Sequence, residues 1–114
     1  MGTALGSASP GLEVHFRDRD ALAAAFSVRN ARANGLEPAS WETGLTLAGL
    51  SGRRFDRIVS NVPAKAGPSV IRDFILRLPS ALTEGACFAL VVVNPIARAV
   101  RAAVTASGAE ILAE

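Results

Sequence analysis

An apolar strand that runs directly into a polar, proline-stiffened corner constrains this chain more than any other feature. Within residues 55–67, Ile58 and Val59 suit a buried parallel strand. Asn61 then offers an amide that both donates and accepts hydrogen bonds, and Pro63 fixes the backbone just beyond it. Asn and Pro are also common in ordinary turns. The corner alone therefore leaves two alternatives open, a plain turn and a strand end that carries chemistry.

The segments after the corner favour the second alternative. Residues 70–78 have the apolar period of a helix, residues 83–86 contain a glycine turn, and residues 87–93 are unbroken apolar. This order predicts a βαβ unit in an α/β protein, with parallel strands covered by helices on both faces. Ligands of such sheets bind at the carboxyl ends of the strands, where Asn61 and Asn94 fall.

The same pattern is predicted upstream, with a strand over residues 12–18 and a helix over residues 21–34 that Gly35 closes. An acidic residue just past a strand tip can accept hydrogen bonds from ribose hydroxyls. Two acids compete for this role. We assign Asp20 to the helix N-cap and Asp18 to a ligand.

The last segments predict one more helix and the beginning of a strand. Residues 96–107 have a helical pattern that Gly108 ends, and residues 109–114 are expected to start a strand. Asn94 precedes Pro95, so a helix cap is favoured for it over a place in a pocket. Cys87, alone in an apolar segment, is expected to be a buried, inert thiol.

Composition agrees with a single domain over residues 1–114. A chain of 114 residues with 50% hydrophobic residues can bury one core, and a net charge of +2 does not by itself argue for nucleic acid. One His and one Cys provide neither a zinc ligand set nor a disulfide. No signal peptide is evident, and residues 87–93 are too short to span a bilayer. These features predict a cytoplasmic protein that needs no metal and no membrane.

The order of these pieces resembles the class I S-adenosylmethionine-dependent methyltransferases, in particular the methyltransferase small domain group that contains ribosomal RNA guanine-N2 methyltransferases. The resemblance covers nearly the whole chain. It rests on the acidic strand end at residues 12–18 and on segments that match the patterns "NAxxNGL", "FDlIvsNPPFhxG" and "LkpGG", at residues 30–36, 55–67 and 82–86.

The resemblance implies a Rossmann-like, doubly wound, mostly parallel sheet with strand order 3-2-1-4-5-7-6. No glycine-rich donor loop occurs in the sequence, and residues 1–11 align with the helix that follows that loop in the family. We therefore expect a partial methyltransferase fold that lacks the first and last strands, and a chain that alone is inactive or nearly so. Sheet edges left unpaired in this way would favour a homo-oligomer.

The resemblance also implies S-adenosylmethionine as the cofactor and assigns the site residues. Asp18 would bind the ribose of the donor, and Glu42 or Thr43 the edge of its adenine. Asn61 and Pro63 would form the catalytic corner between donor and acceptor, with Asn61 close to both. The acceptor side would be lined by Ala64, Lys65 and Asn94. The methyl group would pass to a nitrogen or oxygen of an RNA or a small molecule.

The corner departs from the family pattern. The family has Asn-Pro-Pro followed by an aromatic residue, whereas this chain has Val62 before Pro63 and Ala64 after it. Ala64 cannot stack on a target base. Lys65 fits an acidic or phosphorylated acceptor, although a solvated surface lysine is the favoured interpretation. Two other classes of function stay open: an inactive domain that serves as an association scaffold, and a different nucleotide-binding α/β domain.

Overall fold

The computed structural model describes residues 1–50 and 52–114. Contacts between residues group the chain into two compact units, Met1–Ala48 and Gly49–Glu114, and each unit is described by itself. The assignment of residues 1–114 to one domain stays a prediction.

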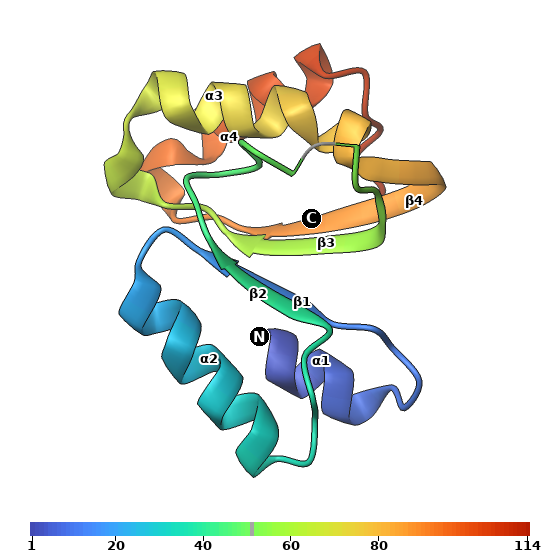
Figure 1. Cartoon of the computed structure of the whole chain (residues 1–114). Coiled ribbons are helices and arrows are strands. Elements are labelled where there is room, and N and C mark those ends of the chain that lie inside the picture. Colours follow the sequence, from blue (N-terminus) through green and yellow to red (C-terminus); the bar gives the residue numbers. More distant parts are fainter. Residues whose placement is uncertain (51) are drawn as a thin grey trace. The chain divides into compact units, whose positions relative to one another are not determined.

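The first unit is a parallel strand pair with helices on one face. Its elements are α1 (Gly2–Ala8), β1 (His15–Asp18), α2 (Ala21–Ala33) and β2 (Ser40–Thr43). The register pairs His15 with Ser40 and Asp18 with Thr43. Both α1 and α2 lie on the same face of the pair (Figure 1). The strand predicted over residues 12–18 starts at His15, although Ala39 N still donates to Val14 O at 2.9 Å.

Small side chains let the helices of the first unit approach closely. Ala24, Val28 and Ala31 are buried along one stripe of α2, which is the spacing of an amphipathic helix. A Cβ on Gly6 of α1 would lie 2.5 Å from Cδ2 of Leu36, so a larger residue there would force the Leu36 side chain to shift. As predicted, α2 ends where Gly35 takes a left-handed conformation, with φ of 75°.

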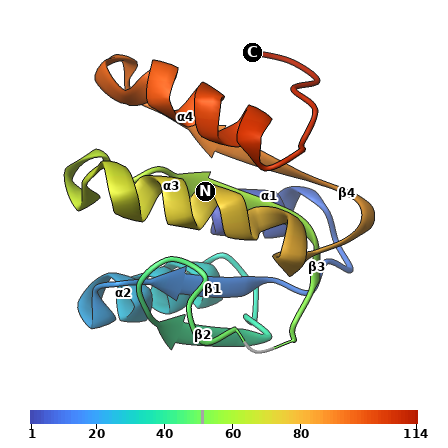
Figure 2. The ribbon, with the colours of Figure 1, turned by 90° about the horizontal axis from the view of Figure 1, so that it is seen from above.

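The second unit confirms the predicted βαβ arrangement. Its main elements are β3 (Phe55–Asn61), α3 (Pro68–Arg77), β4 (Leu82–Val91) and α4 (Asn94–Ala106), with short 3-10 helices at Ala64–Ala66 and Leu78–Ala81. β3 and β4 are parallel, with Ile58 opposite Phe88 and Asn61 opposite Val91. Figure 2 shows α3 and α4 side by side. The core of this unit includes the fully buried Ile75 of α3 and Leu78, which begins the second 3-10 helix.

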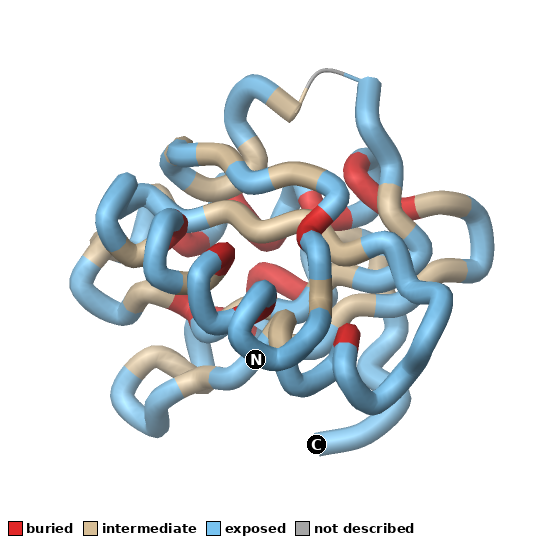
Figure 3. The backbone as a smooth tube through the Cα atoms, turned by 60° about the horizontal axis from the view of Figure 1, so that its bottom comes forward, coloured by how far each residue is buried: buried red, intermediate tan, exposed pale blue. Residues whose placement is uncertain are grey.

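In the described part of the second unit, helices cover one face of the strand pair rather than the predicted two. Ile58 and Phe88 are half-buried on the helix side, whereas the alternate residues of both strands are exposed (Figure 3). The exposed face carries Cys87, so its assignment as a buried thiol was wrong. Alternation along β4 is the reason, because the odd-numbered residues from Cys87 to Val91 point away from the helices.

The α/β class with parallel strands is confirmed, but the described strands form two two-stranded sheets rather than one wound sheet. The glycine turn predicted at residues 83–86 was also wrong, because these residues lie inside β4. β4 starts at Leu82, and Gly85, with φ of 72°, lies in an irregularity of the ladder between Phe55 and Arg57. After α4, residues 109–114 form no strand, which corrects that prediction.

A substitution at Ile75 tests whether the core of the second unit lies around this residue. Because its side chain is 0% exposed, Ile75→Ala should lower the free energy of unfolding by about 2–5 kcal/mol in urea titrations. The matched control is Leu76→Ala, on the same helix at a side chain that is 38% exposed. Equal losses for the two variants would contradict this account of the core.

Candidate functional site

The carboxyl edge of β1 and β2 brings two of the predicted donor-binding residues together. Asp18 and Thr43 end the two strands, lie opposite each other in the register and are both exposed. Because the strands are parallel, their ends share one edge of the sheet. The edge therefore presents a carboxylate and a hydroxyl next to each other.

Asp18 and Asp20 make different hydrogen bonds, and Asp20 forms the helix cap that the sequence predicted. Asp20 Oδ1 accepts from Leu22 N at 2.8 Å and from Ala23 N at 3.3 Å, which makes it the N-cap of α2. Asp18 Oδ1 accepts from Asp20 N at 3.0 Å and so tightens the turn between strand and helix. The other oxygen, Asp18 Oδ2, has no protein donor within the described residues.

Loss of the Asp20 cap should destabilise the first unit without removing Asp18 or Thr43 from the edge that they share. Asp20→Ala leaves two amides at the start of α2 without their acceptor, so we expect a loss of about 0.5–2 kcal/mol in chemical unfolding. Asp20→Asn keeps an acceptor oxygen and should retain most of the stability. If the Asn variant loses as much as the Ala variant, the hydrogen bonds are not the cause.

Glu42 and Thr43 are not equivalent candidates for the adenine edge. Successive residues of a strand point to opposite faces, so Glu42 faces away from the side that Thr43 takes. Glu42 Oε2 is 2.9 Å from Arg17 Nη1, and the two side chains are 35% and 18% exposed. The structure commits Glu42 to Arg17 and leaves Thr43 beside Asp18.

Arg17 is a residue that sequence reasoning missed. Its Nε donates to Thr46 O at 2.8 Å and its Nη2 donates to Ala48 O, so one guanidinium holds two carbonyls of the loop after β2. The signal in the sequence was a basic residue directly before the acidic end of a predicted strand. Its partner Glu42 could be recognised only from the register of β1 and β2.

The second unit presents the predicted corner at the carboxyl end of β3. Asn61 is exposed, and Val62 N donates to Val91 O at 2.9 Å, which prolongs the ladder by one residue. Val62 is buried, and Pro63 is half-buried. Burial of Val62 anchors the corner and holds Asn61 at the surface.

The remaining acceptor candidates lie close to the same edge. Ala64 and Lys65 are exposed in the 3-10 helix that follows Pro63. Gly67, with φ of 92°, then leads into α3. Asn94 lies in the first turn of α4 and makes no side-chain cap bond, so its assignment as a helix cap was wrong; Val93 takes the cap position.

Other polar groups lie apart from these edges. His15 Nδ1 is 2.7 Å from Ser40 Oγ across the ladder. Bonds from Arg32 to Glu37 lower the pKa of the Glu37 carboxyl and raise that of the guanidinium. Among residues 1–50 and 52–114, no group of His, Cys, Asp or Glu is placed to hold a metal ion. No helix in the described part of the chain is long and apolar enough to cross a membrane.

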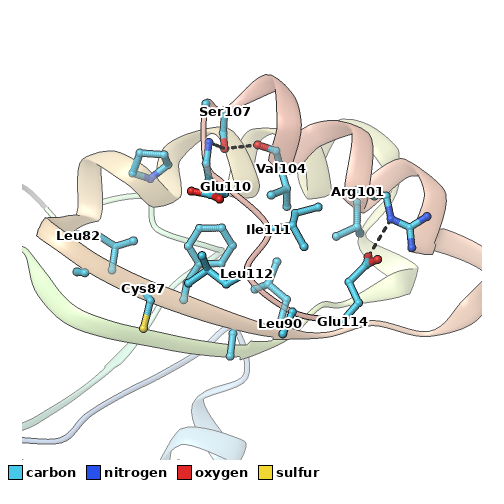
Figure 4. Close-up of a pocket in the computed structure, with 18 of the residues that line it drawn as sticks. Leu82, Cys87, Leu90, Arg101, Val104, Ser107, Glu110, Ile111, Leu112 and Glu114 are labelled. Carbon is cyan, nitrogen blue, oxygen red and sulfur yellow. Dashed lines mark hydrogen bonds and ion pairs between the residues drawn. The ribbon is translucent and has the colours of Figure 1, made fainter.

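A cavity of about 940 Å³ lies between β4, α4 and the C-terminal segment. Figure 4 shows Leu90, Val104 and Ile111 around it, with an ion pair of 2.8 Å between Arg101 Nε and Glu114 Oε1. The predicted site residues are all described, and none of them lines this cavity. It is therefore separate from the candidate site.

Comparison with known proteins identifies the family. The family model "Methyltransferase small domain" matches residues 1–109. No curated protein and no solved structure matches the chain closely enough to add a relative. Because the match covers almost the full length, this chain belongs to the methyltransferase small domain family, which confirms the resemblance found in the sequence.

Proposed function

We propose that this protein is an S-adenosylmethionine-dependent methyltransferase domain whose first unit binds the nucleoside part of the donor. Membership of the family supports methyl transfer in general. The observation that carries the finer proposal is the pairing of Asp18 with Thr43 at the exposed carboxyl edge of β1 and β2. Ligands of parallel α/β sheets bind at such an edge.

The chemistry of this edge suits an adenine nucleoside. Asp18 Oδ2 can accept hydrogen bonds from ribose hydroxyls while Oδ1 stays in the turn with Asp20 N. The Thr43 hydroxyl can donate to a ring nitrogen or accept from an exocyclic amine. Of the two residues considered for the adenine edge, we choose Thr43, because Arg17 occupies the Glu42 carboxylate.

The corner of the second unit would serve the acceptor. When bound, S-adenosylmethionine supplies an electrophilic methyl group. Asn61 would accept a hydrogen bond from the target amine or hydroxyl, and the Pro63 backbone would brace it. Alignment of the nucleophile for in-line displacement needs neither a metal nor a triad. With donor and acceptor bound, Asn61 would hold the acceptor nitrogen or oxygen in line with the methyl group. The transfer would exchange the carbon–sulfur bond of the donor for a carbon–nitrogen or carbon–oxygen bond, and the acceptor proton would leave to solvent.

Ala64 and Lys65 define the chemistry of the acceptor side. Ala64 offers no ring for stacking on a base, and Lys65 is exposed beside it with a positive charge. These two residues, with Asn94, fit an acceptor held by charge and hydrogen bonds rather than by stacking. RNA and small phosphorylated molecules both meet this description.

The ribose contact can be tested with two variants of Asp18. In calorimetric titrations with S-adenosylhomocysteine, Asp18→Ala should lower the affinity about tenfold or more, since a charge-assisted hydrogen bond is lost. Asp18→Asn keeps an oxygen for Asp20 N but has no second acceptor, so it should lose a similar amount while the turn remains. Unchanged binding by both variants would remove Asp18 from the donor site.

The acceptor contact predicts a different kinetic signature for Asn61. Asn61→Ala should lower turnover by about 10²-fold and leave donor affinity nearly unchanged, because its hydrogen bond acts on the acceptor. The measurement is incorporation of labelled methyl groups into ribosomal RNA, and it is made with protein that has transfer activity. Asn30→Ala, at an exposed position of α2, is the control. Equal loss of turnover and donor affinity would move Asn61 away from the acceptor.

We expect the 114 residues by themselves to transfer methyl groups at or near background, because the sequence contains no glycine-rich donor loop. Clear incorporation by the purified chain above the Asn61→Ala variant would contradict this expectation.

A further inference from the structure

The loop after β2 begins next to Thr43, at the edge to which the proposed function assigns the nucleoside. Residues 44–48 follow Thr43 directly and have few backbone hydrogen bonds of their own. Gly44 N donates to Asp18 O at 3.0 Å, and Ala48 N donates to Leu45 O at 3.3 Å. Between them, Thr46 has φ of 54°, an unfavourable left-handed conformation for a β-branched residue. Contacts from outside the loop are therefore needed to hold Thr46 in this conformation.

Arg17 is in a position to do so. Its guanidinium donates to the carbonyls of Thr46 and Ala48 and pairs with Glu42, so three contacts fix one largely buried side chain. The planar fork of Arg loses little conformational freedom for each bond that it forms. One of the three contacts falls on the strained Thr46 itself.

Gly44 is fitted to the same guanidinium. A Cβ at this position would collide with Arg17 Nη2 and Cζ, although the backbone of Gly44 is outside the left-handed region. The glycine is therefore needed for space and not for its conformation. The loop and the arginine form one packed arrangement.

We propose that Arg17 is a positioning residue for the donor nucleoside, which it serves by holding the loop of residues 44–48 beside Thr43. β1 places Asp18 at the ligand edge and its neighbour Arg17 on the opposite face, where it reaches the loop. The strand β1 thus supplies Asp18, which would bind the ribose, and Arg17, which would support the loop on the adenine side. This inference rests on the proposed function.

The test combines ligand binding with hydrogen exchange. Arg17→Met keeps the apolar stem and removes the charge and the donors. Arg17→Lys can still reach one carbonyl. Gly44→Ala keeps the arginine and its charge but displaces the guanidinium. Arg32→Met is the matched control, because Arg32 also makes several bonds to a carboxylate, that of Glu37, but contacts no part of the loop.

Binding is measured by calorimetry with S-adenosylhomocysteine and with methylthioadenosine. The second ligand contains the nucleoside but not the amino-acid part of the first. We expect Arg17→Met and Gly44→Ala to weaken both ligands by the same factor, about tenfold or more. Arg17→Lys should fall between these variants and the unmodified protein, and Arg32→Met should bind normally. In the unliganded protein, the amides of residues 44 and 48, which donate the backbone hydrogen bonds of the loop, should exchange faster in Arg17→Met and Gly44→Ala only.

Three results would overturn the inference alone. They are normal binding by Arg17→Met, weaker binding with unchanged exchange in the loop, and an equal loss for Arg32→Met, which would show a general effect of stability. If the unmodified protein binds neither ligand, the proposed function fails first, and the role of Arg17 falls with it. The two failures are therefore distinguishable.

Discussion

Parallel pairing of neighbouring strands is the constraint on which every candidate site in this protein depends. Each pair is joined by a segment that contains a helix, α2 in the first unit and α3 in the second, so both strands of a pair run the same way. Their carboxyl ends then share one edge. Asp18 and Thr43 meet at such an edge although 25 positions separate the residues that pair across β1 and β2.

Strand alternation then separates paired from exposed side chains within a single residue step. Arg17 and Glu42 point to one face and hold each other, while Asp18 and Thr43 end their strands at the exposed edge. The same rule operates in β4, where Phe88 faces the helices and Cys87 faces away. The exposure of these side chains therefore follows the alternation along each strand.

Local features of the fold could be predicted because local interactions determine them. Asp20 caps α2 through amides two and three residues away, and Gly35 and Gly108 end helices through their own left-handed conformations. Asn94 was predicted less well. A Pro beside an Asn is typical of a helix start, but the helix began one residue earlier and left the Asn side chain without a cap role.

The sequence by itself determined the βαβ order of the second unit, the helix ends at Asp20, Gly35 and Gly108, and the family, because periodicity, capping and motif spacing act over short distances along the chain. Only the tertiary structure showed that Glu42 pairs with Arg17 while Thr43 lies opposite Asp18, and that Arg17 binds two carbonyls of the loop after β2. It also showed which face of each strand pair the helices leave open. These outcomes depend on which residues lie opposite each other across a ladder, and pairing between distant segments is set by packing that no local pattern records.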